Sequence, residues 1–495
     1  MIPRPSFFSL SITSNTLIPP FSRRTSKSVC EEFSDGQECP SHPEVAMVDV
    51  LHAASYAAFM TRQSLVLLLV ASFPLVARGD WPEFRGPYGN GHVLADGAGE
   101  PIGLPTAWSE TENVRWKTAI PERGWSTPVV MDGQVWLTTA TEDGHDYYAI
   151  CIDAESGEIL HNKELFHSDA PEPLGNEVNC YAAPSPAIEP GRVYVHFGSY
   201  GTACLDTATG DVLWQRDDLP CRHYRGPSSS VVLFEDLVIL TLDGADLQYV
   251  VALDKKTGDT VWKTDRDVEW NDQDVTGKSP AAAKRALDGD MRKAHSTPLI
   301  IKTPDGQLQM LSGGAKAAFA YDPRTGGELW RMEFDDFSVA PRPLYHDGVA
   351  YMPTGNILTE LWAIRTDAKG NVSDSDGVLW RQRSRVGKTS SPILVDGLLY
   401  MATDDGIVNC IDAASGDPVW QKRVGGSFAA SPIYGDGHLY FCDLEGQTTI
   451  IKPGRKFEEV ATNKLDDGLM ASPAVDERAL YLRTKTHLYR VENES

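Results

Sequence analysis

The stretch DTATGDVLW, residues Asp206–Trp214, occurs in this chain in several closely related copies. The same pattern, Asp-x-x-Thr/Ser-Gly-x-x-x-Trp, returns at Asp254–Trp262, Asp322–Trp330 and Asp412–Trp420. In each copy the glycine suits a tight turn, and the flanking residues are typical of two paired strands. A pattern that returns along a chain indicates one structural unit used repeatedly.

Each unit begins with a second recurring feature, a Ser-Pro or Thr-Pro step followed by a hairpin. In one copy Ser391-Pro392 leads to Asp396-Gly397 and then to Tyr400. Asp-Gly between apolar runs predicts a two-residue turn, because both central residues of that turn need positive φ. Each unit is therefore expected to contain two hairpins, that is, four antiparallel strands. The predicted starts of the units are Ser126, Ser185, Ser228, Ser296, Ala340, Ser391, Ser431 and Ser472.

The spacing of these starts favours a radial arrangement. Most intervals are about 40 to 50 residues, two are near 58 and 68, and no helical stripe runs through them. Stacking four-stranded sheets around an axis buries both faces of each sheet. We therefore predict an all-β, eight-bladed β-propeller. The last unit is one strand short, and Asn113–Thr118 resembles the missing outer strand, so this segment is expected to close the ring by pairing with the C-terminal blade.

The residues before Asn113 are predicted to lie outside the ring, and the first of them carry a targeting pattern. Residues 60–79 contain an apolar run, Leu65–Val76, and end in Ala77-Arg78-Gly79, as in a cleavable secretory signal. The run is too short to span a bilayer. Residues 1–59 lack this pattern, and two interpretations stay open: a start codon assigned too far upstream, or an authentic disordered extension. The propeller domain is expected to cover residues 80–495.

The composition of the chain limits its partners. The formal net charge is −24, which argues against nucleic acid or an anionic membrane as a partner. The mature chain of about 415 residues is expected to form one large repeat domain, a monomer without a transmembrane segment. Its location is predicted to be periplasmic or secreted.

Two of the cysteines differ from the others in their place in the repeat. Cys151, Cys204 and Cys410 precede the turn aspartate and are expected to be small buried strand residues. Cys180 and Cys221 lie in connections of neighbouring blades, where export would let them oxidise. A Cys180–Cys221 disulfide and two free thiols are the alternatives. The cysteine and histidine spacings predict no metal site.

The repeated turns resemble the tryptophan-docking motif of the PQQ-like, or quinoprotein-type, propellers, across residues 80–495. The opening DWPEFRGP, residues 80–87, is similar to the start of many exported PQQ-like repeat proteins. In this resemblance the docking positions are architectural: the tryptophan of one blade packs on the next, and the glycine permits the turn. They are Asp206, Gly210, Trp214, Asp254, Gly258, Trp262, Asp322, Gly326, Trp330, Asp412, Gly416 and Trp420.

The resemblance implies two different functions. Quinoprotein alcohol dehydrogenases hold PQQ with calcium and cap the quinone with a disulfide between adjacent cysteines. This chain has no adjacent cysteines and no Cys-x-x-Cys-His haem motif. BamB-like propellers act instead as binding surfaces, usually as lipoproteins, and this chain shows no lipobox. We expect no cofactor, with PQQ and calcium as the alternative.

A binding site is expected where the sequence departs from its repeat. The two long intervals, His167–Ala183 and Asp265–His295, join an outer strand to the next inner strand, so both should lie at one mouth of the axial funnel. Arginine and tyrosine in the run Arg222–Arg225 suit an anionic or sugar-like ligand, and Asn179, Asp335 and Asp336 could offer oxygen ligands to calcium. The predicted ligand-binding residues at the mouth are Trp125, Asn179, Arg222, His223, Tyr224, Arg225, His295, Asp335, Asp336 and Lys388.

The sequence therefore predicts an exported binding or scaffold protein. Its partner would be an envelope protein, or a small polar ligand such as a sugar, held at the axial funnel. PQQ-dependent oxidation of an alcohol or sugar is the alternative function, and hydrolase or lyase action at the funnel is a third class. No residue is assigned a catalytic role.

Overall fold

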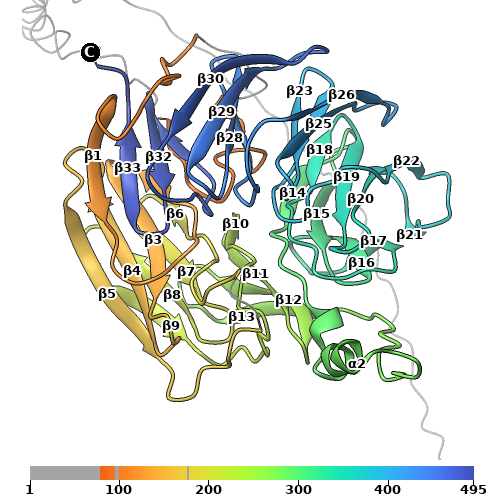
Figure 1. Ribbon diagram of the computed structural model, residues 1–495. Helices are drawn as coiled ribbons and strands as arrows, with labels where there is room; N and C mark the ends of the chain where they lie inside the picture. The colour runs from red at the N-terminus through yellow and green to blue at the C-terminus, as the bar shows by residue number, and fades with distance from the viewer. Residues whose placement is uncertain (1–78, 95–99, 176–177, 495) are drawn as a thin grey trace, which may run out of the picture. The chain divides into compact units, whose positions relative to one another are not determined.

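The computed structural model describes residues 79–94, 100–175 and 178–494. Residues 1–59 and nearly all of the predicted signal segment lie outside these ranges. The described residues form eight separate sheets, each of which contains the four antiparallel strands predicted for a blade, and the sheets are arranged as an eight-bladed β-propeller (Figure 1). None of the helices in these ranges is long and apolar enough to span a bilayer.

The first four blades run in chain order from the innermost strand outward. Blade 4 carries a fifth strand, β21, which pairs in parallel with β17. The strands are β2 (Val129–Met131), β3 (Gln134–Ala140), β4 (Asp146–Asp153) and β5 (Ile159–His167) in blade 1; β6 (Ala187–Glu189), β7 (Arg192–His196), β8 (Thr202–Asp206) and β9 (Val212–Arg216) in blade 2; β10 (Val232–Phe234), β11 (Leu237–Asp243), β12 (Gln248–Asp254) and β13 (Thr260–Asp265) in blade 3; and β14 (Leu299–Lys302), β15 (Leu308–Gly313), β16 (Ala317–Tyr321), β17 (Glu328–Glu333) and β21 (Gly370–Asn371) in blade 4.

The second half of the ring repeats the arrangement. The insertion between blades 3 and 4 holds a helix, α2 (Pro280–Leu287), and a short 3-10 turn, η2 (Asp290–Arg292). The remaining strands are β18 (Leu344–His346), β19 (Val349–Thr354), β20 (Glu360–Arg365) and β22 (Val378–Gln382) in blade 5; β23 (Ile393–Val395), β24 (Leu398–Ala402), β25 (Ile407–Asp412) and β26 (Pro418–Arg423) in blade 6; β27 (Ile433–Gly435), β28 (His438–Cys442), β29 (Gln447–Lys452) and β30 (Glu458–Lys464) in blade 7; and β31 (Ala474–Asp476), β32 (Ala479–Arg483), β33 (His487–Val491) and β1 (Val114–Ala119) in blade 8.

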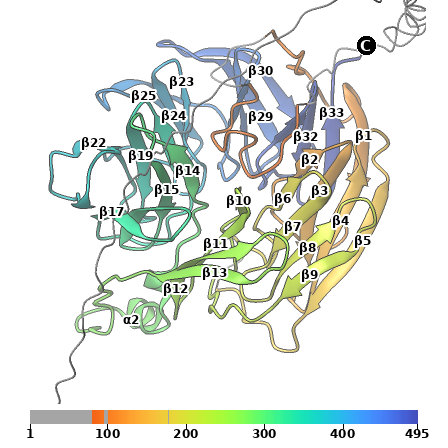
Figure 2. The same cartoon turned by 180° about the vertical axis from the view of Figure 1, so that it is seen from behind.

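Blade 8 closes the ring as the sequence predicts. Its outer strand is β1, which pairs antiparallel with β33 over Val114–Ala119 and His487–Val491. In Figures 1 and 2 the orange β1 lies beside the blue β33, although the two strands come from opposite ends of the domain. The ring therefore has no open sheet edge at the junction of its two ends.

The inner hairpins take the turn conformation that their sequences predict. Asp132, Asp347, Asp396 and Asp436 have φ values of 52°, 44°, 50° and 51°, and the glycine after each is also at positive φ. A turn with positive φ at both central residues matches the right-handed twist of the flanking strands.

The recurring Ser/Thr-Pro step links neighbouring blades through hydroxyl groups. Thr127 N donates to Ser185 Oγ at 2.9 Å, and Ser185 N donates in turn to Ser230 Oγ at 3.0 Å. The same bond joins Ser391 N to Ser431 Oγ at 3.0 Å and Ser431 N to Ser472 Oγ at 2.9 Å. The repeated serine therefore holds one blade to the next.

The docking tryptophans also act between blades. The ring of Trp214 packs against Gly258, and Trp214 Nε1 donates to Lys255 O at 2.9 Å in blade 3. Trp380 makes the equivalent bond to Ala413 O at 3.1 Å, in blade 6. In blade 1, where histidine replaces the tryptophan, His161 packs against Gly210 of blade 2 in the same way.

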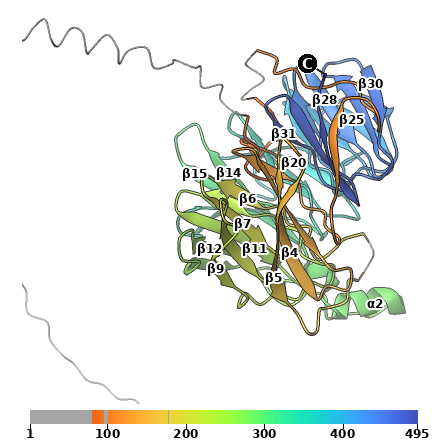
Figure 3. The same cartoon turned by 90° about the vertical axis from the view of Figure 1, so that its left-hand side faces the viewer.

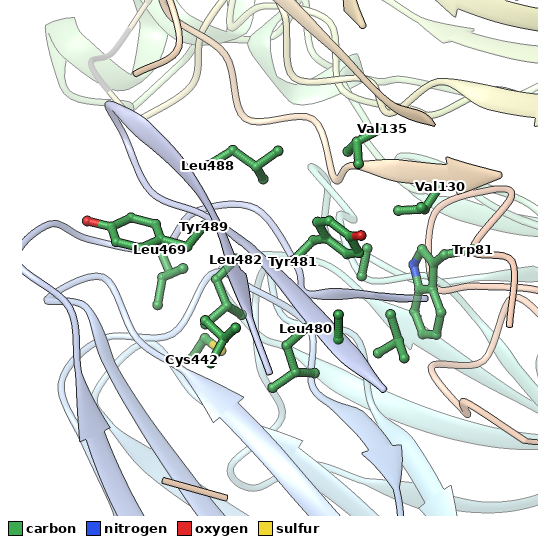
Figure 4. Packing of buried hydrophobic residues seen from close by; sticks show 14 of the residues in the cluster. Trp81, Val130, Val135, Cys442, Leu469, Leu480, Tyr481, Leu482, Leu488 and Tyr489 are labelled. Carbon is green, nitrogen blue, oxygen red and sulfur yellow. The ribbon is translucent and has the colours of Figure 1, made fainter. Parts of the chain in front are cut away.

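The segment Trp81–Val93 departs from the prediction that residues before Asn113 lie outside the ring. Trp81 forms a bridge with Val130 of β2, and His92 forms one with Tyr434 of β27. Figure 4 shows Trp81 beside Val130 and close to Leu480 and Tyr481, all of which belong to one buried cluster. The segment adds no strand to a blade, but it also contacts blades 2 and 6, because Pro82 O accepts from Ile188 N of β6 and His92 Nε2 lies 2.7 Å from Leu394 O of β23. We call it the axial segment.

One buried arginine fixes the axial segment to blades 4 and 5. Arg342 Nε and Nη2 donate to Pro298 O at 3.1 and 2.9 Å, and Nη1 donates to Phe84 O at 2.5 Å. Arg342 Nη1 also lies 3.0 Å from Glu83 Oε1. The side chain of Arg342 is 1% exposed, so these partners replace the water that a guanidinium would otherwise bind.

Candidate functional site

Both long insertions lie at the same end of the blades. The strands of each sheet are antiparallel, so the connection from an outer strand to the next inner strand lies at the same end as the turn between the second and third strands. We call this end of the ring the insertion face. Figure 3 shows α2, part of the second insertion, projecting beyond the strands of the neighbouring blades.

Two ion pairs fix the position of the second insertion, Asp265–His295. Both oxygens of the buried Asp290 accept hydrogen bonds from Arg225, with Nη2 donating to Oδ2 at 2.6 Å. Asp272 accepts in the same bidentate way from Arg292, at 2.7 and 2.9 Å. Bidentate pairs of this kind fix orientation as well as distance. The insertion is therefore held against the loop that contains Arg225.

The run Arg222–Arg225 is predicted to bind a ligand, and its two arginine side chains pair with carboxylates of the protein itself. Arg222 Nη2 lies 2.9 Å from Glu172 Oε1, and Arg225 binds Asp290. The guanidinium of Arg225 lies over the ring of Tyr224. Of the four side chains, that of His223 lines the cavity described below.

The other predicted residues of the mouth do not converge on one pocket. Asn179 Nδ2 donates to Arg225 O and Ser228 Oγ at 2.9 and 2.8 Å, between blades 2 and 3. Asp336 instead binds backbone N–H groups of the loop that follows β19, in blade 5. The side chains of Trp125, His295, Asp335 and Lys388 are spread over the junctions between blades 8 and 1, 3 and 4, 4 and 5, and 5 and 6.

The oxygen atoms that could have held calcium are therefore not assembled. Asp336 Oδ2 accepts from Asn356, Ile357 and Leu358 N at 2.9, 2.8 and 2.7 Å. Asp335 is nearly fully exposed and pairs with Lys316 at 3.2 Å. Over the described ranges, no three His, Cys, Asp or Glu side chains are grouped so that they could hold a metal ion.

A small cavity lies where blades 2, 3 and 4 meet at the insertion face. The volume of the cavity, apart from the open solvent at its mouth, is about 10 Å³. That space suits one water molecule, and a tricyclic quinone or a sugar does not fit it as it stands. The lining residues are His196, His223, Pro227, Ser228, Ser229, Thr241, Asp243, Lys293 and Ala294.

The lining is polar, and several of its atoms have no hydrogen bond. Thr241 Oγ1 and both carboxylate oxygens of Asp243 are buried without a hydrogen-bond partner in the part of the chain that the structure describes. Arg266 Nε lies 2.7 Å from Asp243 Oδ1, but the two groups are not aligned for a hydrogen bond. Buried polar atoms without partners are rare in folded proteins and need an explanation.

Burial shifts the titration of the groups around the cavity. It lowers the pKa of His196 to about 3 and the pKa of the Lys293 ammonium from its usual range. The pKa of His223 is also lowered, first by burial and then by Lys293. The pKa of the Asp243 carboxyl is raised by burial, which outweighs the opposing effect of Arg266. All four shifts disfavour the charged form of the group concerned.

His223 is among the site residues predicted from the sequence, whereas His196, Thr241, Asp243 and Lys293 are not. A signal for two of them exists in the repeat. His196 and Thr241 occupy the same register position, two residues beyond the residue that pairs with the first residue of the inner strand. Ala402 and Cys442 occupy this position in blades 6 and 7. Thr138 and Arg483 are also polar at this position, in blades 1 and 8, so the position narrows the candidates but does not mark the cavity by itself.

A disulfide and two free thiols were the alternatives for Cys180 and Cys221, and in the structure both residues are buried free thiols. Their surroundings differ. The Cys221 thiol lies 3.9 Å from His223 Nδ1, beside the cavity, whereas Cys180 lies near Arg483 and Arg123. Burial raises the pKa of both thiols, to about 11 for Cys180 and about 12 for Cys221, which disfavours the thiolate.

Comparison with known proteins agrees with this architecture. Residues 84–217 and 246–495 match the family described as outer membrane protein assembly factor BamB. The curated BamB of Yersinia pestis is 24% identical over 260 residues, which cover 51% of this chain and 57% of that protein. The chain thus matches little more than half the length of this relative.

Two solved structures show the same fold at low identity. BamB from Moraxella catarrhalis is 13% identical, with a TM-score of 0.51 over 76% of this chain and 99% of that one. A europium-containing methanol dehydrogenase is 13% identical, with a TM-score of 0.58 over 82% and 89% of the two chains. These likenesses concern the fold alone. Because the family match covers most of the sequence, the chain belongs to the BamB family of PQQ-like repeat propellers.

Proposed function

We propose that this chain is a binding protein of the cell envelope that docks a protein partner on its insertion face. The proposal draws on the family, whose described members are outer membrane protein assembly factors. It also draws on the predicted secretory signal. The observation that carries it is the distribution of exposed apolar side chains over the described loops.

The large apolar side chains that the described loops expose gather on the insertion face. Apart from Tyr88 in the axial segment, each one belongs to an insertion or to a turn between a second and a third strand. The remaining exposed apolar side chains lie on outer strands. Those of the insertion face are Val178, Leu247, Leu287, Ile357 and Leu358.

The most exposed pair is presented by a rigid turn. Ile357 and Leu358 are 65% and 71% exposed. Their backbone N–H groups and that of Asn356 are bound by the buried carboxylate of Asp336. Gly355 lies at φ 58°, and a Cβ there would come within 2.1 Å of Asp336 Oδ2. An apolar tip that is already ordered loses little entropy when it binds.

The charge of the chain indicates what the partner should offer. The net charge is −24, and Asp335, adjacent to the anchoring Asp336, is nearly fully exposed. We therefore propose a partner with an apolar cleft bordered by basic side chains, within the machinery that assembles outer membrane proteins. Opposite charges at the rim would speed the encounter, and the tip would supply the affinity.

Photo-crosslinking tests this proposal in the native host. A photoreactive residue at position 358 should crosslink to one assembly component, and Ile357→Ser should abolish the crosslink. Leu379, which is 46% exposed on β22 of the same blade, is the matched control position. Purified Ile357→Ser/Leu358→Ser should bind the partner at least about 10-fold more weakly without unfolding earlier. Equal crosslinking from positions 358 and 379, or none from 358, would refute the proposal.

A further inference from the structure

The cavity between blades 2, 3 and 4 is not used by the docking function and raises a separate question. It brings together a buried lysine, two histidines and an aspartate from four different segments of the chain. His196 ends β7, His223 precedes β10, Asp243 ends β11, and Lys293 follows η2. Thr241 and Asp243 are 5% and 4% exposed and present atoms without hydrogen bonds to this space.

The hydrogen bonds of His223 decide where its proton lies. The backbone N–H of Ser199 donates to His223 Nε2 at 2.8 Å. A backbone amide can only donate, so Nε2 must be unprotonated. The proton of the neutral imidazole then lies on Nδ1, and this nitrogen is a donor.

The same geometry fixes the state of Lys293. Its Nζ lies 3.4 Å from His223 Nδ1, which is the one hydrogen-bond contact of this amine among the described residues. An ammonium group would oppose one donor with another and would be buried, at 1% exposure, without a hydrogen-bond acceptor in the part of the chain that the structure describes. A neutral amine instead accepts the Nδ1 proton in its lone pair.

Charged and titratable groups from every neighbouring element bear on this amine. His223 and Cys221 come from the loop before β10, His196 from β7, and Asp243 from β11. Glu172 comes from the first insertion and Asp246 from the turn after β11, and both favour the ammonium, as Asp243 and Cys221 do. Burial outweighs these groups and lowers the pKa of Lys293.

We propose that Lys293 is an unprotonated, nucleophilic amine that condenses with small aldehydes in this cavity. The Nζ lone pair attacks the carbonyl carbon and forms a carbinolamine. Loss of the carbinolamine oxygen as water then leaves a C=N double bond to Nζ. The two hydrogens of the departing water come from the amine, so no oxidant or reductant is needed. The water-sized space restricts the partner to aldehydes of about one or two carbons.

The unpartnered lining atoms suit this reaction. The carbinolamine carries a hydroxyl that both donates and accepts hydrogen bonds. Thr241 Oγ1 lines this cavity without a hydrogen bond among the described residues and can bind that hydroxyl, and the Asp243 carboxylate, which pairs with Arg266, lines the same cavity. Burial also removes the competing water that hydrolyses an imine in bulk solution.

Reductive trapping on the whole purified chain tests the proposal. The probe is isotopically labelled formaldehyde with cyanoborohydride, and peptide mass spectrometry measures the rate at each lysine. An ordinary lysine has a pKa near 10.4, so only about one in 2,500 is unprotonated at pH 7. Lys293 should therefore react on the order of 100-fold faster than Lys388, whose side chain is 45% exposed. Between pH 6 and 8 its rate should change little, whereas that of Lys388 should rise about tenfold per unit.

Two comparisons make the result specific. His223→Gln removes the Nδ1 donor and should make labelling of Lys293 depend on pH, while Cys221→Ser should not. Benzaldehyde, which is too large for the cavity, should label Lys388 but not Lys293. Labelling of Lys293 no faster than that of Lys388 at pH 7, or with the same pH slope, would overturn the proposal. This outcome is independent of whether a protein docks on the insertion face.

Discussion

Arg342 and Lys293 are two basic side chains that are equally buried, at 1% exposure, but bonded very differently. Arg342 donates to Pro298 O and Phe84 O and pairs with Glu83. Lys293 has one hydrogen-bond contact among the described residues, His223 Nδ1 at 3.4 Å. The first joins the axial segment to the ring, and the second lies in a cavity where Thr241 Oγ1 has no hydrogen-bond partner among the described residues. Equal burial therefore does not imply an equal role, and the bonding of the side chain distinguishes the two.

The largest effect on stability should follow from replacing Arg342, the buried cation with several bonds. Arg342→Met leaves Glu83 without its charge partner and two carbonyls without donors, so the free energy of unfolding should fall by about 3–5 kcal/mol. Urea denaturation measures the change. Arg324→Met is the matched control, because Arg324 pairs with Glu235 at the surface and is 57% exposed. It should cost at most about 1 kcal/mol. An equal loss in both variants would contradict the comparison.

His196, which lines the cavity, should make the free energy of unfolding depend on pH. The folded pKa of His196 is lowered to about 3, below the unfolded value near 6.5. The unfolded chain therefore binds a proton in this range that the folded chain excludes. Stability should be complete above about pH 6.5 and fall as the pH is lowered towards 3, by roughly 2 kcal/mol for this group at pH 5.

Urea midpoints at pH 5 and pH 7 measure that loss. His196→Gln should reduce the difference between the two midpoints. His346→Gln, at an exposed site, should leave the difference as it is in the wild type. No change in the His196 variant would show that His196 is not held neutral by the fold.

The buried carboxylates of Asp336 and Asp243 differ in their bonding in the same way as Arg342 and Lys293 do. Asp336 accepts four backbone N–H bonds, whereas Asp243 accepts none. Asp336→Ala leaves those donors unpaired and should lower the free energy of unfolding by about 1–3 kcal/mol. Amide hydrogen exchange should also become faster at Asn356–Leu358. Asp335→Ala is the control at an exposed neighbour, and an equal effect there would argue against the anchoring role of Asp336.

The smallest effect on stability should come from replacing Lys293, which has one long hydrogen bond. Lys293→Met keeps much of the side-chain volume and replaces a buried amine that has one long hydrogen bond, so the free energy of unfolding should change by less than about 1.5 kcal/mol. Urea denaturation beside Arg342→Met is the direct comparison. A loss of 3 kcal/mol or more would mean that Lys293 is a charged structural group.

The architecture could be predicted because the sequence pattern of one blade recurs along the chain. The turn at Asp206–Trp214, the serines before the inner strands and the strand Asn113–Thr118 each have counterparts elsewhere in the chain, so the number of blades and the closure of the ring followed from the sequence. The axial segment has no counterpart. Its contacts join residues about 300 positions apart, such as Arg85 and Pro392, and no local pattern encodes them.

The candidate site was predictable only in part, for the same reason. The insertions lie at the same end of the blades as the cavity, and His223 is the predicted residue that lines it. The side chains of Arg222, Arg225 and Asn179 were expected to face a ligand, but they bind Glu172, Asp290 and backbone carbonyls. Lys293 lies in an irregular insertion, where neither period nor motif shows which side chain turns inward.

The pairing of β1 with β33 has a consequence for the order in which this protein can form. Asn113 O accepts a bond from Glu492 N, across nearly the whole length of the domain. A chain that leaves the ribosome or crosses a membrane from its N-terminus must keep Val114–Ala119 unpaired until the final hairpin arrives. Until then, the unpaired edge of β1 and the inner-strand surfaces that the axial segment covers are exposed at the same time. Folding of such a long-range topology is slow, so chaperone demand and protease sensitivity should be greatest just before the last strand is released.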